Sequence, residues 1–190
     1  MSPAEATTPS GKAHVMFGQL KSNALMRLNR IIKTQDTLVS LRGYRDKSEL
    51  SNGIEKLDAD LQDLQAARDF LVDPVPKLRE LLMAQNVDEL AVNIYCRAAK
   101  ERSAAEGPYL KQLTDAIAER GSSGAAYLKV MRDRWGEWTM RPAENRISFQ
   151  NTFIQKAYQQ ASQEFVERTR AVTSAAEALS NWNKTTASAR

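Results

Sequence analysis

The side chains that most resemble a functional site are tryptophans and arginines gathered between residues 131 and 142. That stretch reads M-R-D-R-W-G-E-W-T-M-R-P, and its candidate residues are Arg132, Arg134, Trp135, Trp138 and Arg141. Tryptophan and arginine carry much of the binding energy at protein interfaces. They also suit the headgroup region of a membrane. A third interpretation is structural, with both tryptophans closing one end of a bundle and the arginines in solvent or paired with nearby carboxylates.

A second candidate is a basic face formed by Arg27, Arg30 and Lys33. The three side chains fall on the side of a predicted helix that faces away from its apolar residues. Such a face is either plain solvent-exposed surface or a site that attracts anionic lipid or an acidic protein partner. The sequence disfavours nucleic acid, because the next helix is acidic and no aromatic residues are interleaved with the basic ones.

Residues that catalysis or metal binding would need are scarce. His14 is the single histidine and Cys96 the single cysteine. No cysteine–histidine cluster has zinc spacing, and no acidic loop resembles a calcium site. The sequence also contains no glycine-rich phosphate loop and no Gly-x-Ser-x-Gly elbow. We therefore expect a protein that is not an enzyme and uses no cofactor or metal, with His14 on the surface and Cys96 as a small buried apolar residue.

The composition favours helices around one core. The chain has 190 residues, 42% of them hydrophobic, with only 8 Gly and 6 Pro. No apolar run is long enough to span a membrane, and residues 1–12 lack the features of a secretory signal. A single cysteine fits a reducing compartment. We expect a cytoplasmic protein, with export without a cleavable signal, or a peripheral position on a membrane, as alternatives.

The net charge of +4 is unevenly distributed along the chain. Residues 1–47 hold eight Lys/Arg and three Asp/Glu, whereas residues 48–73 hold two and seven. This pattern predicts two neighbouring helices of opposite charge. Each exposed ion pair contributes only about 0–1 kcal/mol. The opposed charges nevertheless favour this pairing over the association of two basic helices.

The longest periodic stretch runs from Ile147 to Trp182. Of eleven positions taken alternately four and three residues apart, nine are apolar or aromatic, which places them on one stripe of a helix. We predict one helix over about 143–183, roughly 60 Å long at 1.5 Å per residue. We expect its first half to be buried within the monomer. The candidate surface for a partner lies in its second half and consists of Val172, Leu179 and Trp182.

The remaining elements complete an all-α prediction: an elongated antiparallel helical bundle with a long C-terminal spine helix. An N-terminal helical hairpin is predicted over about 13–72, because a short turn at Gly43 joins two apolar-striped segments. Residues 77–138 are predicted to form shorter helices, interrupted at Gly107-Pro108 and at residues 121–124. Asp88 is the predicted N-cap of one of them.

The predicted domain organisation has three parts. Residues 1–12 are expected to be a disordered head, because they contain no periodic apolar residues. Residues 13–183 form a single helical-bundle domain. Residues 184–190 are expected to be a frayed tail.

These features predict a non-enzymatic interaction module, meaning a scaffold, an adaptor, a chaperone-like protein or a regulator that acts through contacts with other proteins. The last predicted helix exceeds the first two by about 20 Å. Either the helices of residues 77–138 or a second subunit must cover that excess, and the second option gives a homodimer. The alternatives are a peripheral membrane-binding bundle that uses its basic and tryptophan-rich surfaces, and an exported effector or toxin-like bundle.

Overall fold

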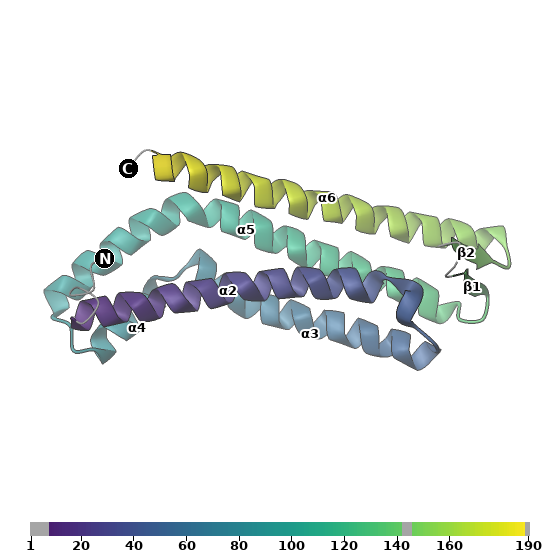
Figure 1. Cartoon of the computed structure of the whole chain (residues 1–190), viewed down its shortest axis with the longest axis horizontal. Coiled ribbons are helices and arrows are strands. Elements are labelled where there is room, and N and C mark those ends of the chain that lie inside the picture. The colour runs from purple at the N-terminus through teal and green to yellow at the C-terminus, as the bar shows by residue number, and fades with distance from the viewer. Residues whose placement is uncertain (1–7, 142–145, 189–190) are drawn as a thin grey trace.

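The structure of the chain, a computed structural model, describes residues 8–141 and 146–188 and, at Arg42, the backbone alone. Its helices run up and down the length of one rod (Figure 1). They are α2 (Pro9–Val39), α3 (Lys47–Val72), α4 (Val75–Ala84), α5 (Glu89–Asp133) and α6 (Thr152–Ser188), with a short 3-10 turn, η1 (Leu41–Gly43), between α2 and α3. The predicted all-α, elongated antiparallel bundle with a long C-terminal helix is confirmed.

Side-chain caps explain where several helices begin. α2 begins at Pro9, earlier than predicted, because Thr8 accepts a hydrogen bond from the backbone N–H of Gly11 at 3.1 Å. α3 ends at Val72, where the predicted hairpin ends, and Asp46 caps its beginning by accepting from the N–H of Glu49 at 2.8 Å. The predicted N-cap role of Asp88 is also confirmed. These caps satisfy backbone donors that the first turn of a helix leaves unpaired.

The two ends of the chain are more helical than predicted, where they are described. Residues 9–12 of the predicted head form the first turn of α2. α6 continues to Ser188, so residues 184–188 of the predicted tail are helical. Residues 1–7 and 189–190 lie outside the described residues.

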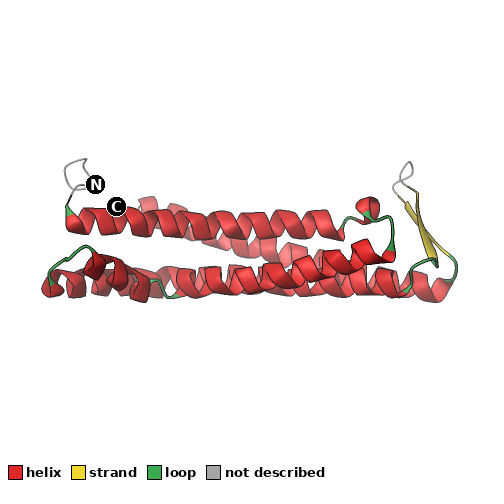
Figure 2. Ribbon diagram, turned by 90° about the horizontal axis from the view of Figure 1, so that it is seen from below, coloured by secondary structure: helices red, strands yellow, loops and turns green. Residues whose placement is uncertain are grey.

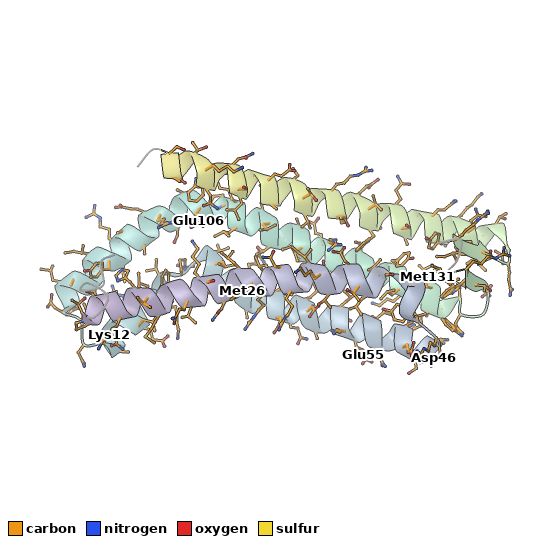
Figure 3. The ribbon with its side chains drawn as sticks, in the orientation of Figure 1. Lys12, Met26, Asp46, Glu55, Glu106 and Met131 are labelled. Atoms are coloured by element: carbon orange, nitrogen blue, oxygen red, sulfur yellow. The ribbon has the colours of Figure 1, made fainter. Side chains whose placement is uncertain are left out.

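The prediction of short, broken helices over residues 77–138 is wrong for most of that stretch. α5 is one helix of 45 residues that runs through both Gly107-Pro108 and residues 121–124. Pro108 bends this helix, because a proline inside a helix removes one backbone hydrogen bond and crowds the preceding turn. Figure 3 shows the bend beside the labelled Glu106, and Figure 1 shows the N-terminal arm of α5 turned toward α4.

Gly121 and Gly124 are contact points between helices, not a flexible linker. A Cβ atom on Gly121 would lie 2.7 Å from Nε2 of Gln35 and 3.0 Å from Cδ2 of Leu61. A Cβ atom on Gly124 would lie 3.3 Å from Cε2 of Phe165. The missing side chains therefore allow α2, α3 and α6 to approach α5 closely.

The hydrophobic core consists of three clusters along the rod, and α5 contributes to all three. The central cluster joins α2, α3, α5 and α6, and Leu28, Leu64 and Ile117 are among its buried members. A second cluster lies toward the end where α2 meets α3, and a third joins α2, α4 and the arm of α5. α5 is thus the central helix that the others surround. The sequence pattern had assigned this role of a spine to the helix predicted over residues 143–183.

A two-stranded hairpin, which was not predicted, separates α5 from α6. β1 (Trp138–Arg141) pairs antiparallel with β2 (Arg146–Phe149), and Trp138 is opposite Phe149. Figure 2 shows the hairpin at the end of the rod opposite to the end where α6 finishes. α6 therefore begins at Thr152 and not near residue 143, with Asn151 accepting a hydrogen bond from the N–H of Ile154 at 3.0 Å.

The predicted apolar stripe of α6 faces α5, but few of its side chains are fully buried. Ile154, Val172 and Ala175 are the buried residues of this helix. Two of these three lie in its second half. The predicted burial of the first half is confirmed at Ile154, whereas Tyr158, Ala161 and Phe165 are half-buried. α6 packs chiefly on α5, and most of its surface is in contact with solvent.

A buried arginine, which the sequence analysis missed, ties three helices together. Arg120 on α5 is only 1% exposed. Its Nε donates to Oγ1 of Thr169 on α6 at 2.9 Å, and its Nη1 donates to Oε1 of Gln35 on α2 at 3.1 Å. Its Nη2 pairs with Asp36, and the guanidinium lies 4.9 Å from the ring centre of Phe165. Each nitrogen of the guanidinium therefore has a partner and one partner is a carboxylate, as burial of an arginine requires.

Alanine substitutions at two glycines should change stability in opposite directions. Gly121→Ala should lower the free energy of unfolding by about 1–3 kcal/mol, because the new Cβ displaces the buried amide of Gln35 and outweighs the helix propensity of alanine. Gly18→Ala should raise the free energy by about 0.5–1 kcal/mol, because a Cβ there meets no atom within 4 Å. Urea unfolding followed by circular dichroism measures both. Stabilisation by Gly121→Ala would contradict the close packing at α5.

Arg120→Met should lower the free energy of unfolding by about 2–4 kcal/mol, because buried partners on α2 and α6 lose their donors. The matched control is Arg170→Met on α6, where the side chain is exposed and the change should stay within about 0.5 kcal/mol. Thermal and urea unfolding of both variants would check the prediction. Equal stabilities of the two variants would show that the network around Arg120 does not hold the helices together.

Candidate functional site

A groove opens where α2, α3, α4 and the bend of α5 meet. It has a volume of about 840 Å³. The chain turns a corner between α3 and α4 at Pro74 and Pro76, and Pro108 bends α5 away nearby. Because neither segment can continue straight, the four helices leave a hollow between them. We call this hollow the α2–α4 groove.

The α2–α4 groove has an apolar floor and a charged rim. Small side chains of Ala24 and Ala67 lie beside the larger ones of Leu20 and Phe70, which makes the surface concave. The charged residues of the rim are Arg27, Arg68, Asp69, Asp73, Lys77 and Lys111. An apolar floor with polar groups at its edges is typical of a binding site for a ligand or for the side chains of a partner.

Three of the four cations of the rim are paired within the chain. Arg68 and Lys111 both contact Asp115, at 2.8 Å and 2.6 Å. Lys77 pairs with Glu80 at 2.6 Å. Among the described residues, no ion pair involves Arg27. Arg27 is therefore the rim cation that is most accessible to a carboxylate on a partner.

The structure divides the predicted basic face between two sites. Arg27, Arg30 and Lys33 are all exposed, as predicted, but only Arg27 lines the α2–α4 groove. Arg30 and Lys33 line a shallower hollow of about 600 Å³, which they share with Lys56 of α3. Arg30 also pairs with Asp63 of α3 at 2.8 Å. The basic helix therefore faces the acidic helix, as the charge pattern predicted.

The tryptophan–arginine cluster is assembled at the hairpin end of the rod. Trp135 and Trp138 form an edge-to-face pair with ring centres 5.2 Å apart. Trp138 is only 8% exposed, and its Nε1–H donates to the backbone carbonyl of Met131 at 2.9 Å. It belongs to the core, as the structural interpretation of the cluster expects. Trp135 is half-buried beside it.

The arginines of this cluster are on its surface. Arg132 pairs with Asp133 at 2.9 Å, and Arg134 lies 3.6 Å from a carboxylate oxygen of Glu137. Arg141 is exposed at the end of β1. The pairs with neighbouring carboxylates agree with the structural interpretation of the cluster, and a role for its exposed side chains in binding stays a prediction.

The predicted partner surface on α6 is covered in part by its own chain. Val172 is 7% exposed and belongs to the central core cluster, so its assignment to an accessible surface is wrong. Leu179 and Trp182 are half-buried. The ring of Trp182 lies 5.9 Å from that of Tyr109 on α5, where it helps to hold the end of α6.

The groups that would support catalysis are held in structural contacts. His14 is half-buried, which corrects its prediction as a surface residue. Its Nδ1 donates to the carbonyl of Ser10 at 2.7 Å, and its ring packs edge-on against Tyr95. Cys96 is buried, as predicted. Burial and the nearby Tyr158 raise the pKa of Tyr127, which keeps that phenol neutral. Within residues 8–141 and 146–188, no cluster of His, Cys, Asp and Glu could hold a metal ion.

The chain matches no protein-family model, no curated protein and no solved structure. No described helix is long and apolar enough to cross a membrane. Sequence reasoning missed the α2–α4 groove. The available signals were the alanine pair Ala66-Ala67 in a leucine-rich helix and the two prolines that follow it, but neither shows that a hollow results.

A partly buried carboxylate of α3 affects the stability of the pair formed by α2 and α3. Oδ2 of Asp60 is buried without a hydrogen-bond partner. Burial raises the pKa of Asp60 above its ordinary value of 3.8, although Lys56 and Arg30 oppose the shift. The raised pKa means that the folded state loses stability as the pH rises from 3.8 through the folded-state pKa.

Asp60→Asn should therefore raise the free energy of unfolding at pH 7 and change it little at pH 3, where the native carboxyl group is protonated in both states. The exposed Asp58 of the same helix provides the control, and Asp58→Asn should show no such gain at pH 7. Urea titrations of the three proteins at both pH values measure the effect. A loss of stability at pH 7 in Asp60→Asn alone would show that attraction by Lys56 and Arg30 outweighs burial.

Proposed function

We propose that this protein is a non-enzymatic helical interaction module that binds an amphipathic segment of a protein partner in the α2–α4 groove. The observation that supports this most directly is the groove itself, an apolar hollow of about 840 Å³ with charged residues at its rim. Recognition of a helix by a hydrophobic groove is a common mode of binding between proteins. A rod of packed helices offers such a groove in a fixed shape, which suits a scaffold or an adaptor.

The partner segment would place apolar side chains against the floor and an acidic side chain near Arg27. Burial of one large apolar side chain stabilises a complex by about 1.5–3 kcal/mol. Ala24, Ala67 and Phe70 provide the surface for such contacts. Arg27 would add selectivity for an acidic neighbour in the segment, because it has no ion pair within the described residues. We propose the cytoplasm as the location, since the buried single cysteine fits a reducing compartment.

Ala66→Leu should abolish this binding, because the larger side chain occupies the groove that Ala66 lines. Ala59→Leu is the matched control: both alanines are exposed on α3, and Ala59 is not part of the groove lining. Proteins retained from lysate by the immobilised wild-type chain should be retained by Ala59→Leu and lost with Ala66→Leu. For a purified partner, Kd should rise about tenfold or more, which corresponds to about 1.4 kcal/mol.

Arg27→Gln gives a second measurement at the same site. It should weaken the complex less than Ala66→Leu does, and the weakening should decrease at high salt, because screening reduces the contribution of an exposed charge. Circular dichroism would show that each variant retains its helices. If a specific partner binds wild type, Ala59→Leu and Ala66→Leu with the same Kd, the α2–α4 groove is not the binding site.

A further inference from the structure

A second, more enclosed cavity lies beside the bend of α5. It has a volume of about 210 Å³ and shares Phe70 with the α2–α4 groove. Its apolar lining comes from α2, α3, α5 and the corner between α3 and α4: Phe17, Phe70, Leu71, Pro74 and Ala99. The rings of Phe17 and Phe70 lie 5.8 Å apart at an angle of 64°. We call it the Phe70 cavity.

Small residues and the bend of α5 together keep the Phe70 cavity open. Gly18 on α2 and Ser103 on α5 contribute little volume to its wall, and a Cβ atom on Gly18 would meet nothing within 4 Å. An alkyl chain that enters the cavity would remove its own apolar surface and that of the lining from water, which favours binding.

One side of the Phe70 cavity is charged. Lys21 and Glu106 form an ion pair at 2.6 Å, and the Glu106 side chain is only 10% exposed. Arg102 also lines the cavity and takes part in no ion pair among the described residues. The cavity therefore has two cations against one carboxylate, and the guanidinium of Arg102 is available. The planar fork of a guanidinium matches the geometry of a carboxylate.

We propose that the Phe70 cavity binds a small amphiphile, a medium-chain aliphatic carboxylate. The chain lies against the paired rings of Phe17 and Phe70, and the carboxylate pairs with Arg102 near the Lys21 ammonium. A volume of about 210 Å³ has room for several water-sized groups in a row, which is the scale of a medium-length alkyl chain. An eight-carbon chain with its carboxylate at the mouth matches that space.

Three probes of equal chain length test the proposal: octanoate, octanol and octylamine. Calorimetry and thermal unfolding of the full-length protein, with each probe kept below the concentration at which it forms micelles, measure binding. Octanoate should raise the Tm in a concentration-dependent way and bind about fivefold more tightly than octanol, a factor that corresponds to about 1 kcal/mol. Octylamine should bind more weakly than octanol. The absence of octanoate binding, or tighter binding of octylamine, would overturn the proposal.

Two pairs of variants locate the binding. Gly18→Leu fills the cavity and should abolish binding of octanoate and octanol, whereas Ser22→Leu, at an exposed site of α2 outside the cavity lining, should change neither. Arg102→Gln should remove the preference for octanoate and leave octanol binding unchanged. Arg97→Gln, also an exposed arginine on the arm of α5, should keep the preference. Unchanged octanoate binding in Gly18→Leu and Arg102→Gln would overturn the assignment to this cavity.

The variants also separate this proposal from the binding of a protein partner. Ala66 lines the α2–α4 groove and not the Phe70 cavity, so Ala66→Leu should leave octanoate binding unchanged. Gly18 lines the Phe70 cavity and not the groove, so Gly18→Leu should leave capture of a protein partner unchanged. Either site can therefore fail its test without affecting the test of the other.

Discussion

Arg120 lies where α2, α5 and α6 meet, and its burial dictates much of the packing around it. Removal of a guanidinium from water costs several kcal/mol, so each of its donors needs a partner in place. Gln35, Asp36 and Thr169 provide these partners from two other helices. The neighbouring Gly121 lets α2 come close enough for the amide of Gln35 to reach both the guanidinium and the carbonyl of Ile117. One charged side chain thus fixes the relative positions of helices that apolar contacts alone would allow to slide.

The sequence predicted the elements that are determined locally. The bounds of α3 follow from its regular apolar pattern and from the cap at Asp46, and both are properties of neighbouring residues. The sequence wrongly predicted helix breaks at Gly107-Pro108 and at residues 121–124, because the local preference of these residues for a break is outweighed by tertiary packing. A glycine costs a helix about 1 kcal/mol and a proline about 3 kcal/mol, and contacts with other helices offset these amounts in α5. The pairing of β1 with β2 was missed because Ile147 of β2 was counted as the first residue of a helical stripe.

The candidate site could be predicted only in fragments. Exposure of Arg27, Arg30 and Lys33 follows from their position on the helix opposite its apolar stripe, but their division between two hollows depends on where α3 and α4 lie. The buried state of Val172 and Trp138 depends on contacts with α5 that a linear pattern does not contain. Arg120 gave no signal, because an arginine in a helical sequence is ordinarily a surface residue and only its distant partners make it a core residue.

The bend at Pro108 connects the stability of the bundle with its hollows. A straight α5 would direct its N-terminal arm along the rod, and Val92 and Cys96 would lose the third core cluster that they form with α2 and α4. Because the arm turns toward α4 instead, it leaves α3 at the point where α3 itself ends at the proline corner. The space between the diverging helices is filled only in part by Phe70, and the groove and the cavity lie on either side of that ring. Both concave sites therefore arise where three prolines force two helices to change direction, while Arg120 holds the neighbouring helices at fixed separations.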